Sequence, residues 1–347
     1  MKTFKRKVKQ KSFGFHHQKE LIILYLKNDN GARLCITNFA ATVMSLEIPK
    51  KNGDLLNVVV GFDSLQDYIE KSKTKESKFL GASIGRYAGR ISNEKININN
   101  VDYPLYHEDG VHLHGGRKGF DERVWDIDYI DEDELLVSLS YLSEHMEEGY
   151  PGNLRVKVTY QLTTANELKI TYQAVSDEDT VVNLTNHTYY NLNGKNTITD
   201  HTLHLNCTDY LEVNEKQLPT GKILPVKGTK YDYLDPQKLI KLSESGIIDD
   251  TLIINSEKNN KAAAITSMES GIKMEVHTNQ PAIVIYTPEK FPDCNYRKGA
   301  EYNRFPAICF ETQNYPDAPN QTHFPSALLK AGELYENKTI IKFCYLD

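Results

Sequence analysis

A histidine stands among amides and aromatic residues in the segment from Asn183 to Leu192, which reads NLTNHTYYNL. Amide side chains bind hydroxyl groups, aromatic faces cover the C–H side of a sugar ring, and an imidazole exchanges a proton near neutral pH. His187 is therefore a candidate proton carrier at a carbohydrate site. The same residue types are also typical of a structural turn.

A second group of imidazoles is formed by His112 and His114, which precede Gly115 and Gly116. On a strand this alternate spacing directs both rings to one side, where two imidazoles could serve as zinc ligands. No third histidine or carboxylate stands at a recognisable ligand spacing, so we predict no metal. Two hydrogen-bonded loop histidines are the plainer interpretation, and the glycines allow the backbone to approach a ligand.

A carboxylate at Glu311 follows the apolar run from Ala307 to Phe310, which predicts a buried strand. A buried glutamate is costly unless it is paired or used, so both a structural ion pair and catalysis explain it. Two further polar segments have a composition that is typical of turns: Ile84 to Ile91 and Ile248 to Thr251.

Several signature motifs are missing from the sequence. It contains no P-loop, no dinucleotide fingerprint and no G-x-S-x-G, so phosphoryl transfer, hydride transfer and serine hydrolysis lose their usual signals. The residues by themselves indicate a polar site with His and Glu that suits a carbohydrate.

Period-two patterning dominates the chain and predicts strands that position these residues. The clearest pair is Leu154 to Leu162 and Leu168 to Ala174, joined by a hairpin-length connection, while helical periodicity is confined to 64–71 and 236–243. We therefore predict an all-β fold, a large antiparallel β-sandwich, in one domain spanning 1–347, because no repeat, linker or composition break marks a boundary. The other predicted strands are 33–39, 42–48, 56–60, 124–130, 135–141, 201–206, 272–276, 282–287 and 339–345.

The composition of the chain indicates which binding partners and which cellular compartment to expect. The formal charge of −6 gives no basic field for nucleic acid, and no apolar run approaches the roughly 20 residues of a membrane helix. The apolar run 21–26 is too short for a signal peptide, so we expect a cytoplasmic protein. Five scattered cysteines without a C-x-x-C pair predict reduced thiols.

The order of these segments resembles the aldose 1-epimerase (galactose mutarotase) family over nearly the whole chain, most strongly in Asn183 to Leu192. The resemblance implies a mutarotase-like β-sandwich enzyme that acts on a free monosaccharide without a cofactor, as a monomer or homodimer. Further matches are Gly85-Arg86 with Gly89-Arg90-Ile91, Leu113-His114-Gly115-Gly116 with Gly119-Phe120-Asp121, Asn279-Gln280-Pro281, Glu311-Thr312-Gln313, Pro316 to Asn320, Phe324-Pro325 and Gly332-Glu333.

The resemblance also implies roles for individual residues. Glu311 becomes the general base, His187 the general acid and His114 a second imidazole near the ring oxygen. The residues implied to bind sugar hydroxyls or to lie beside them are Arg90, Tyr189, Asp249 and Gln280. Arg86 is implied to be structural. The chemistry agrees, because opening a pyranose ring needs one base for the C1 hydroxyl and one acid for the ring oxygen.

Three positions depart from the family pattern and leave the preferred sugar open. Tyr190 stands where Phe or Trp is usual, Gly89 where Asn is common, and Asp250 where His often follows the binding aspartate. Alternatives are an epimerase for maltose or a hexose phosphate, a non-catalytic sugar-binding protein of the same fold, and a lyase or glycoside hydrolase accessory domain. The last of these requires a second carboxylate opposite Glu311 or a metal site.

Overall fold

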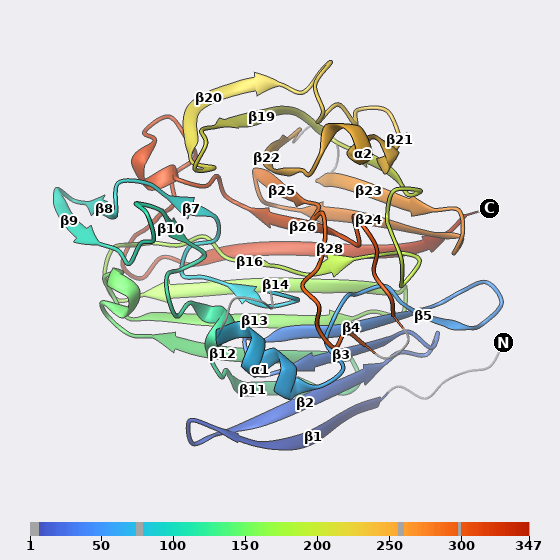
Figure 1. Ribbon diagram of the computed structural model, residues 1–347. Coiled ribbons are helices and arrows are strands. Elements are labelled where there is room, and N and C mark those ends of the chain that lie inside the picture. The colour runs from blue at the N-terminus through green and yellow to red at the C-terminus, as the bar shows by residue number, and fades with distance from the viewer. Residues whose placement is uncertain (1–6, 74–78, 256–259, 298–299, 347) are drawn as a thin grey trace.

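The largest sheet contains nine antiparallel strands in the order β11-β12-β13-β14-β28-β24-β23-β18-β21 (Figure 1). It belongs to a computed structural model that describes residues 7–73, 79–255, 260–297 and 300–346. The predicted hairpin lies at its centre, where β13 (Leu154–Leu162) and β14 (Glu167–Ser176) pair without a break. The other strands are β11 (Asp126–Asp131), β12 (Leu136–Ser143), β18 (Thr202–Leu205), β21 (Gln237–Lys238), β23 (Lys261–Ser267), β24 (Ile272–Thr278) and β28 (Tyr335–Tyr345).

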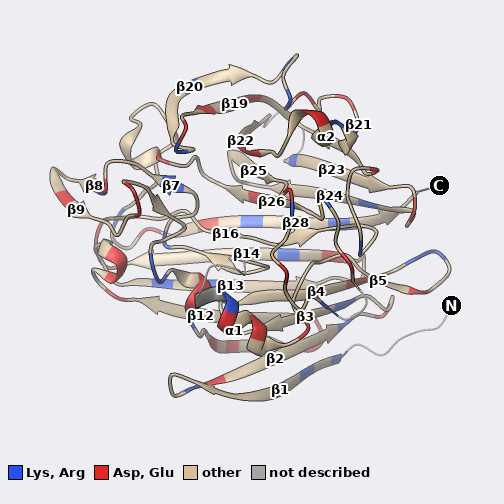
Figure 2. Cartoon of the chain, viewed as in Figure 1, with Lys and Arg blue, Asp and Glu red and all other residues tan. Residues whose placement is uncertain are grey.

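One face of this sheet is polar and the other is buried. Along β13 the side chains alternate between buried and more exposed positions, and Figure 2 shows Lys and Arg recurring along the strands of the sheet. The period-two pattern therefore corresponds to a sheet with one wet face.

A six-stranded sheet in the order β17-β26-β25-β22-β19-β20 packs against the buried face. Ile283, Ile285 and Phe310 belong to the same hydrophobic cluster as Met274 and Phe343 of the nine-stranded sheet. Because side chains alternate along a strand, the intervening residues of the six-stranded sheet, such as Val284 and Glu311, face away from this core. The strands are β17 (Tyr189–Tyr190), β19 (Cys207–Val213), β20 (Pro219–Pro225), β22 (Asp249–Ile254), β25 (Ala282–Tyr286) and β26 (Ile308–Gln313).

A third sheet, with five strands in the order β1-β2-β3-β4-β5, forms the lower edge of the molecule in Figure 1. Its buried residues, among them Leu24 and Leu34, join the main core. The sequence did not predict its first two strands. The bounds are β1 (Lys7–His16), β2 (Lys19–Lys27), β3 (Arg33–Thr37), β4 (Thr42–Pro49) and β5 (Leu55–Asn57).

Short strand pairs and helical turns fill the connections. The pairs are β6 (Ser83–Ile84) with β16 (Thr185–Asn186), β7 (Arg90–Ile91) with β10 (His112–Leu113), β8 (Lys95–Ile98) with β9 (Val101–Pro104), and β15 (Thr180–Val181) with β27 (Leu328–Leu329). The helical elements are α1 (Leu65–Lys73), α2 (Leu242–Ser245), η1 (Phe120–Glu122), η2 (Glu147–Gly149), η3 (Leu239–Lys241) and η4 (Ala318–Asn320).

The predicted fold class is confirmed, since extended residues make up 50% of the described part of the chain and the named sheets are antiparallel. Both predicted helical stretches contain short helical elements. The single domain spanning 1–347 stays a prediction, which the main hydrophobic cluster supports because it runs from Val8 to Phe343. Within the described residues, every helix is too short or too polar to cross a membrane.

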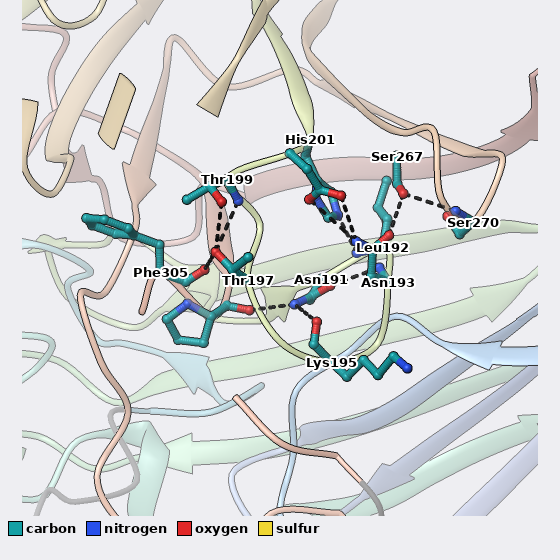
Figure 3. A network of polar contacts seen from close by, with 12 residues as sticks. Asn191, Leu192, Asn193, Lys195, Thr197, Thr199, His201, Ser267, Ser270 and Phe305 are labelled. Atoms are coloured by element: carbon teal, nitrogen blue, oxygen red, sulfur yellow. Dashed lines mark hydrogen bonds and ion pairs between the residues drawn. The ribbon is translucent and has the colours of Figure 1, made fainter. Parts of the chain in front are cut away.

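A network of polar contacts holds the stretch that follows β17 (Figure 3). Asn191 donates through Nδ2 to the carbonyl oxygens of Lys195 at 3.0 Å and Pro306 at 2.8 Å. Buried His201 accepts the Leu192 N–H through Nε2 at 3.1 Å, and its Nδ1 lies 2.9 Å from Asp200 Oδ1. Because Pro306 lies two residues before the start of β26, the network fixes β17 relative to β26.

The buried imidazole of His201 makes the stability of this network dependent on pH. Burial lowers the pKa of His201 below its ordinary value of about 6.5. The unfolded chain therefore takes up this proton more readily, and stability present above pH 6.5 is lost as the pH falls below it. In urea unfolding, we expect the protein to be less stable at pH 5.5 than at pH 7.5.

The variant His201→Gln isolates this contribution, because a glutamine oxygen can accept the Leu192 N–H but cannot take up a proton. Its loss of stability between the two pH values should be smaller than that of the natural protein. The matched control is His277→Gln, at a half-buried position on β24, which should leave the difference unchanged. An undiminished difference in His201→Gln would show that this histidine does not contribute.

Candidate active site

The outer face of the six-stranded sheet forms the floor of a cavity of about 200 Å³. Neighbouring strands place Thr251, Val284 and Glu311 side by side, and Asp249 beside Tyr286 in the next row. All five side chains line the cavity. Its volume lies below the roughly 300–1,000 Å³ of pockets for drug-sized ligands, so it suits one small molecule.

Glu311 lies on β26 and is only 2% exposed. Its Oε1 is 3.4 Å from Nε2 of His187, whereas its Oε2 has no hydrogen-bond partner in the described part of the chain. Burial raises the pKa of Glu311 well above its usual range, the charge of Asp249 adds to this rise, and Arg90 opposes it. This carboxyl is therefore poised to hold or release a proton inside the cavity.

His187 lies in the turn between β16 and β17. Its backbone N–H donates to Ala82 O at 2.9 Å, and its carbonyl accepts Gly81 N–H at 2.9 Å. Nδ1 is 3.6 Å from the thiol sulfur of buried Cys309, so Nε2 is the nitrogen that faces Glu311. Burial lowers the pKa of His187 to about 4.

His114 and Tyr189 complete the group around this pair. The His114 ring lies edge-on to His187 with centroids 5.6 Å apart, and its Nδ1 accepts Gly89 N–H at 3.1 Å. Tyr189 is fully buried, and its ring centroid lies 5.0 Å from that of His187. The imidazole of His187 is therefore held by contacts with two neighbouring rings.

Arg90 and Asp249 form an ion pair at one end of the cavity, with 3.6 Å between Nη2 and Oδ2. Burial raises the pKa of Asp249, and Arg90 opposes that rise. The sequence suggested a turn at Asp249, but this residue is the first of strand β22. Arg86 is 2% exposed and donates to the backbone of residues 143, 151 and 152, which fits its structural interpretation.

One expectation is corrected by the structure, and another stays a prediction. Gln280 precedes β25, its Nε2 donates to Asn279 Oδ1 and Glu336 O, and it is not among the residues that line the cavity, so its binding to a sugar hydroxyl stays a prediction. His112 and His114 do not point to one side, because β10 ends at Leu113 and His114 has a φ of 51°. His112 is buried against Tyr150 instead.

Sequence reasoning missed several residues of the cavity, including Phe79, Val284, Tyr286 and Gln313. Phe79 contacts both imidazoles, at 4.8 Å from His114 and 5.6 Å from His187 between ring centroids. Val284 and Tyr286 lie on a predicted strand, but only its pairing with β26 shows that they share a face with Glu311. That register is long-range information, which no local pattern carries.

The site can perform acid–base chemistry, and its geometry also permits a metal. Ligand atoms of His114, His187 and Glu311 lie within 4.8 Å of one another, which is a possible cation-binding set. The prediction that no metal is needed therefore stays a prediction.

Comparison with known proteins identifies the kind of site. A family model described as aldose 1-epimerase matches residues 23–342. The galactose mutarotase of Bos taurus is 37% identical, over 90% of this chain and 91% of its own length. The chain belongs to the aldose 1-epimerase family. The aldose 1-epimerase of Escherichia coli (strain K12) is 31% identical, over 92% of this chain and 94% of its own.

Solved structures agree with this family assignment. Galactose 1-epimerase from Lactobacillus acidophilus NCFM superposes with a TM-score of 0.84 at 29% identity, covering 99% of this chain and 100% of its own. An aldose epimerase homologue from C. elegans gives 0.86 at 30% identity, covering 94% and 99%. The family match includes every strand that forms the floor of the cavity.

Proposed function

We propose that this chain is a mutarotase that interconverts the α and β anomers of free aldoses such as glucose and galactose. The contact between Glu311 and His187 carries the proposal, because it sets a carboxyl and an imidazole 3.4 Å apart in a cavity sized for one small molecule. The curated relatives are named galactose mutarotase and aldose 1-epimerase, which supports it.

The reaction needs two proton transfers and no change in oxidation state. Glu311 accepts the proton of the C1 hydroxyl while Nε2 of His187 gives a proton to the ring oxygen, and the bond from C1 to the ring oxygen breaks. The open-chain aldehyde rotates about C1–C2. Reclosure returns both protons and yields the other anomer.

The pair must hold one proton in total for this relay to work. Burial favours the neutral form of both groups, so between their two pKa values the resting proton lies on Glu311. A sugar hydroxyl that donates to the carboxylate favours its charged form, as the nearby Arg90 does. Binding of the sugar thereby shifts the proton to His187, where the ring oxygen can receive it.

The remaining residues hold the sugar in place. Arg90 and Asp249 offer a donor and an acceptor to sugar hydroxyls, and His114, whose ring lies against that of His187, is proposed to lie near the ring oxygen. Tyr189 supports the acid by packing against its ring.

The structure favours a monosaccharide over the alternative substrates. Arg90 is paired with Asp249, and Lys230, near the cavity wall, lies 3.6 Å from Asp250, so these cations already face carboxylates and are poor receivers of a phosphate. A volume of about 200 Å³ leaves little room for a second sugar. A non-catalytic sugar-binding protein would have no need of the Glu311–His187 pair.

We also propose that the enzyme works in the cytoplasm as a monomer or homodimer. All five cysteines are free thiols, which is the usual state in a reducing compartment. Fractionation and size-exclusion chromatography test these two points.

Removal of either proton carrier should abolish most of the turnover. We expect Glu311→Gln and His187→Asn to lower kcat by roughly 10²–10⁴-fold, because each positioned proton transfer is worth about that much. Sugar affinity, measured by calorimetry, should change far less. A variant that retains the natural rate would show that another residue moves the proton.

The pH dependence of kcat/KM should be bell-shaped. Below about pH 4, where His187 also becomes protonated, no base remains, and above the raised pKa of Glu311 no acid remains. Asp249→Asn removes a charge that raises the pKa of Glu311, so the alkaline limb should move to lower pH. The control Asp250→Asn removes a charge that faces Lys230 and should leave that limb in place.

Activity should survive prolonged treatment with a chelator, because two proton carriers suffice for ring opening and closing. The measurement is the anomerisation rate before and after dialysis against EDTA. Loss of activity that zinc, magnesium or calcium restores would instead make His114, His187 and Glu311 metal ligands.

A further inference from the structure

Gln313 is an unexplained polar residue in the wall of the cavity. It follows Glu311 by two positions on β26, so both side chains project from the same face of the sheet. It is 0% exposed and lines the cavity, and the family resemblance of the segment Glu311-Thr312-Gln313 assigned it no role.

Among the described residues, only the nitrogen of the Gln313 side-chain amide makes a hydrogen bond. Its Nε2 donates to Asn314 O at 3.3 Å, which fixes the nitrogen on that side. Its Oε1 is buried and has no hydrogen-bond partner among the residues that the structure describes. Buried polar atoms are nearly always paired, so an acceptor left open beside a cavity indicates a donor that arrives with a ligand.

Two small residues keep the space around this amide open. The neighbour of Gln313 across the sheet is Ala282. Opposite the amide is Gly89, whose φ is +83°, and a side-chain carbon there would lie 3.2 Å from Gln313 Nε2 and 3.0 Å from Pro316 Cβ. A larger residue at 89 would therefore close the end of the cavity at which the amide lies.

We infer that Oε1 of Gln313 accepts a hydrogen bond from a second hydroxyl group of the sugar, one that takes no part in the proton transfer. This inference rests on the proposed function and deepens it. Two residues of extended chain span about 7 Å, so Gln313 does not reach the C1 hydroxyl that Glu311 holds. The substrate is thus a sugar with a free hydroxyl away from C1 on the side of β26, and Gln313 discriminates against analogues that lack this group.

A purely structural role is the competing explanation, because the contact with Asn314 also anchors the end of β26. The two explanations differ in a measurable way. A structural residue affects all sugars alike, whereas a hydroxyl-binding residue is coupled to one hydroxyl of the sugar.

The experiment combines variants of Gln313 with sugars that each lack one hydroxyl. Calorimetric affinities are measured in the Glu311→Gln background, where turnover does not interfere, for galactose, glucose and their 2-, 3-, 4- and 6-deoxy forms. We expect Gln313→Leu, which keeps the bulk but removes the amide, to weaken binding of the parent sugar by roughly 5- to 50-fold. For the one deoxy sugar that lacks the hydroxyl bound by Gln313, we expect Gln313→Leu to cause no further loss of affinity.

The matched control is Gln237→Leu, which removes a half-buried glutamine amide on β21, outside the cavity, and should leave every affinity unchanged. If Gln313→Leu does not fold, Gln313→Asn shortens the side chain by one carbon and supports the same comparison. An equal loss for all sugars, or no loss for any, would overturn the inference. Failure of the proposed function would appear separately, as an absence of anomerisation by the natural protein.

Discussion

The site depends on the burial of one carboxyl at the centre of a sheet. Glu311 is 2% exposed, and an ionised carboxylate without compensation costs several kcal/mol in such a place. Arg90 offsets this cost only in part, because it also pairs with Asp249, whose charge raises the pKa of Glu311. The carboxyl meets the imidazole of His187, whose charged form is also disfavoured by burial. Shared protonation is the consequence, and it is what a proton relay requires.

Strand alternation makes this burial possible. On β25 and β26 the side chains that point to one side, such as Ile283 and Phe310, complete the main core, and those that point to the other side form the cavity floor. The core therefore fixes the floor rigidly. The turn that carries His187 leads into β17, which pairs with β26, and the backbone N–H of His114 donates to Gly89 O at 3.0 Å. Residues from separate parts of the chain therefore meet at the site.

The sequence predicted what is local and missed what depends on register. Period-two patterning found β13 and β14, and the amide- and aromatic-rich segment around His187 indicated the site. The role of Gln280 stays a prediction, because its motif lies next to a floor strand and outside the residues that line the cavity. Val284 was missed because only cross-strand pairing shows that it shares the face of Glu311. Gln313 lies two residues after Glu311 on the same strand, so strand alternation could have found it.

The central claim is that the chain transfers protons to and from the ring and C1 oxygens of a free sugar. The most direct measurement is a polarimeter trace of freshly dissolved α-D-galactose, α-D-glucose and maltose, with and without the protein. The account predicts that at least one monosaccharide reaches its equilibrium rotation faster with the protein and that the final rotation is unchanged. If all three sugars mutarotate at the uncatalysed rate, the account is contradicted.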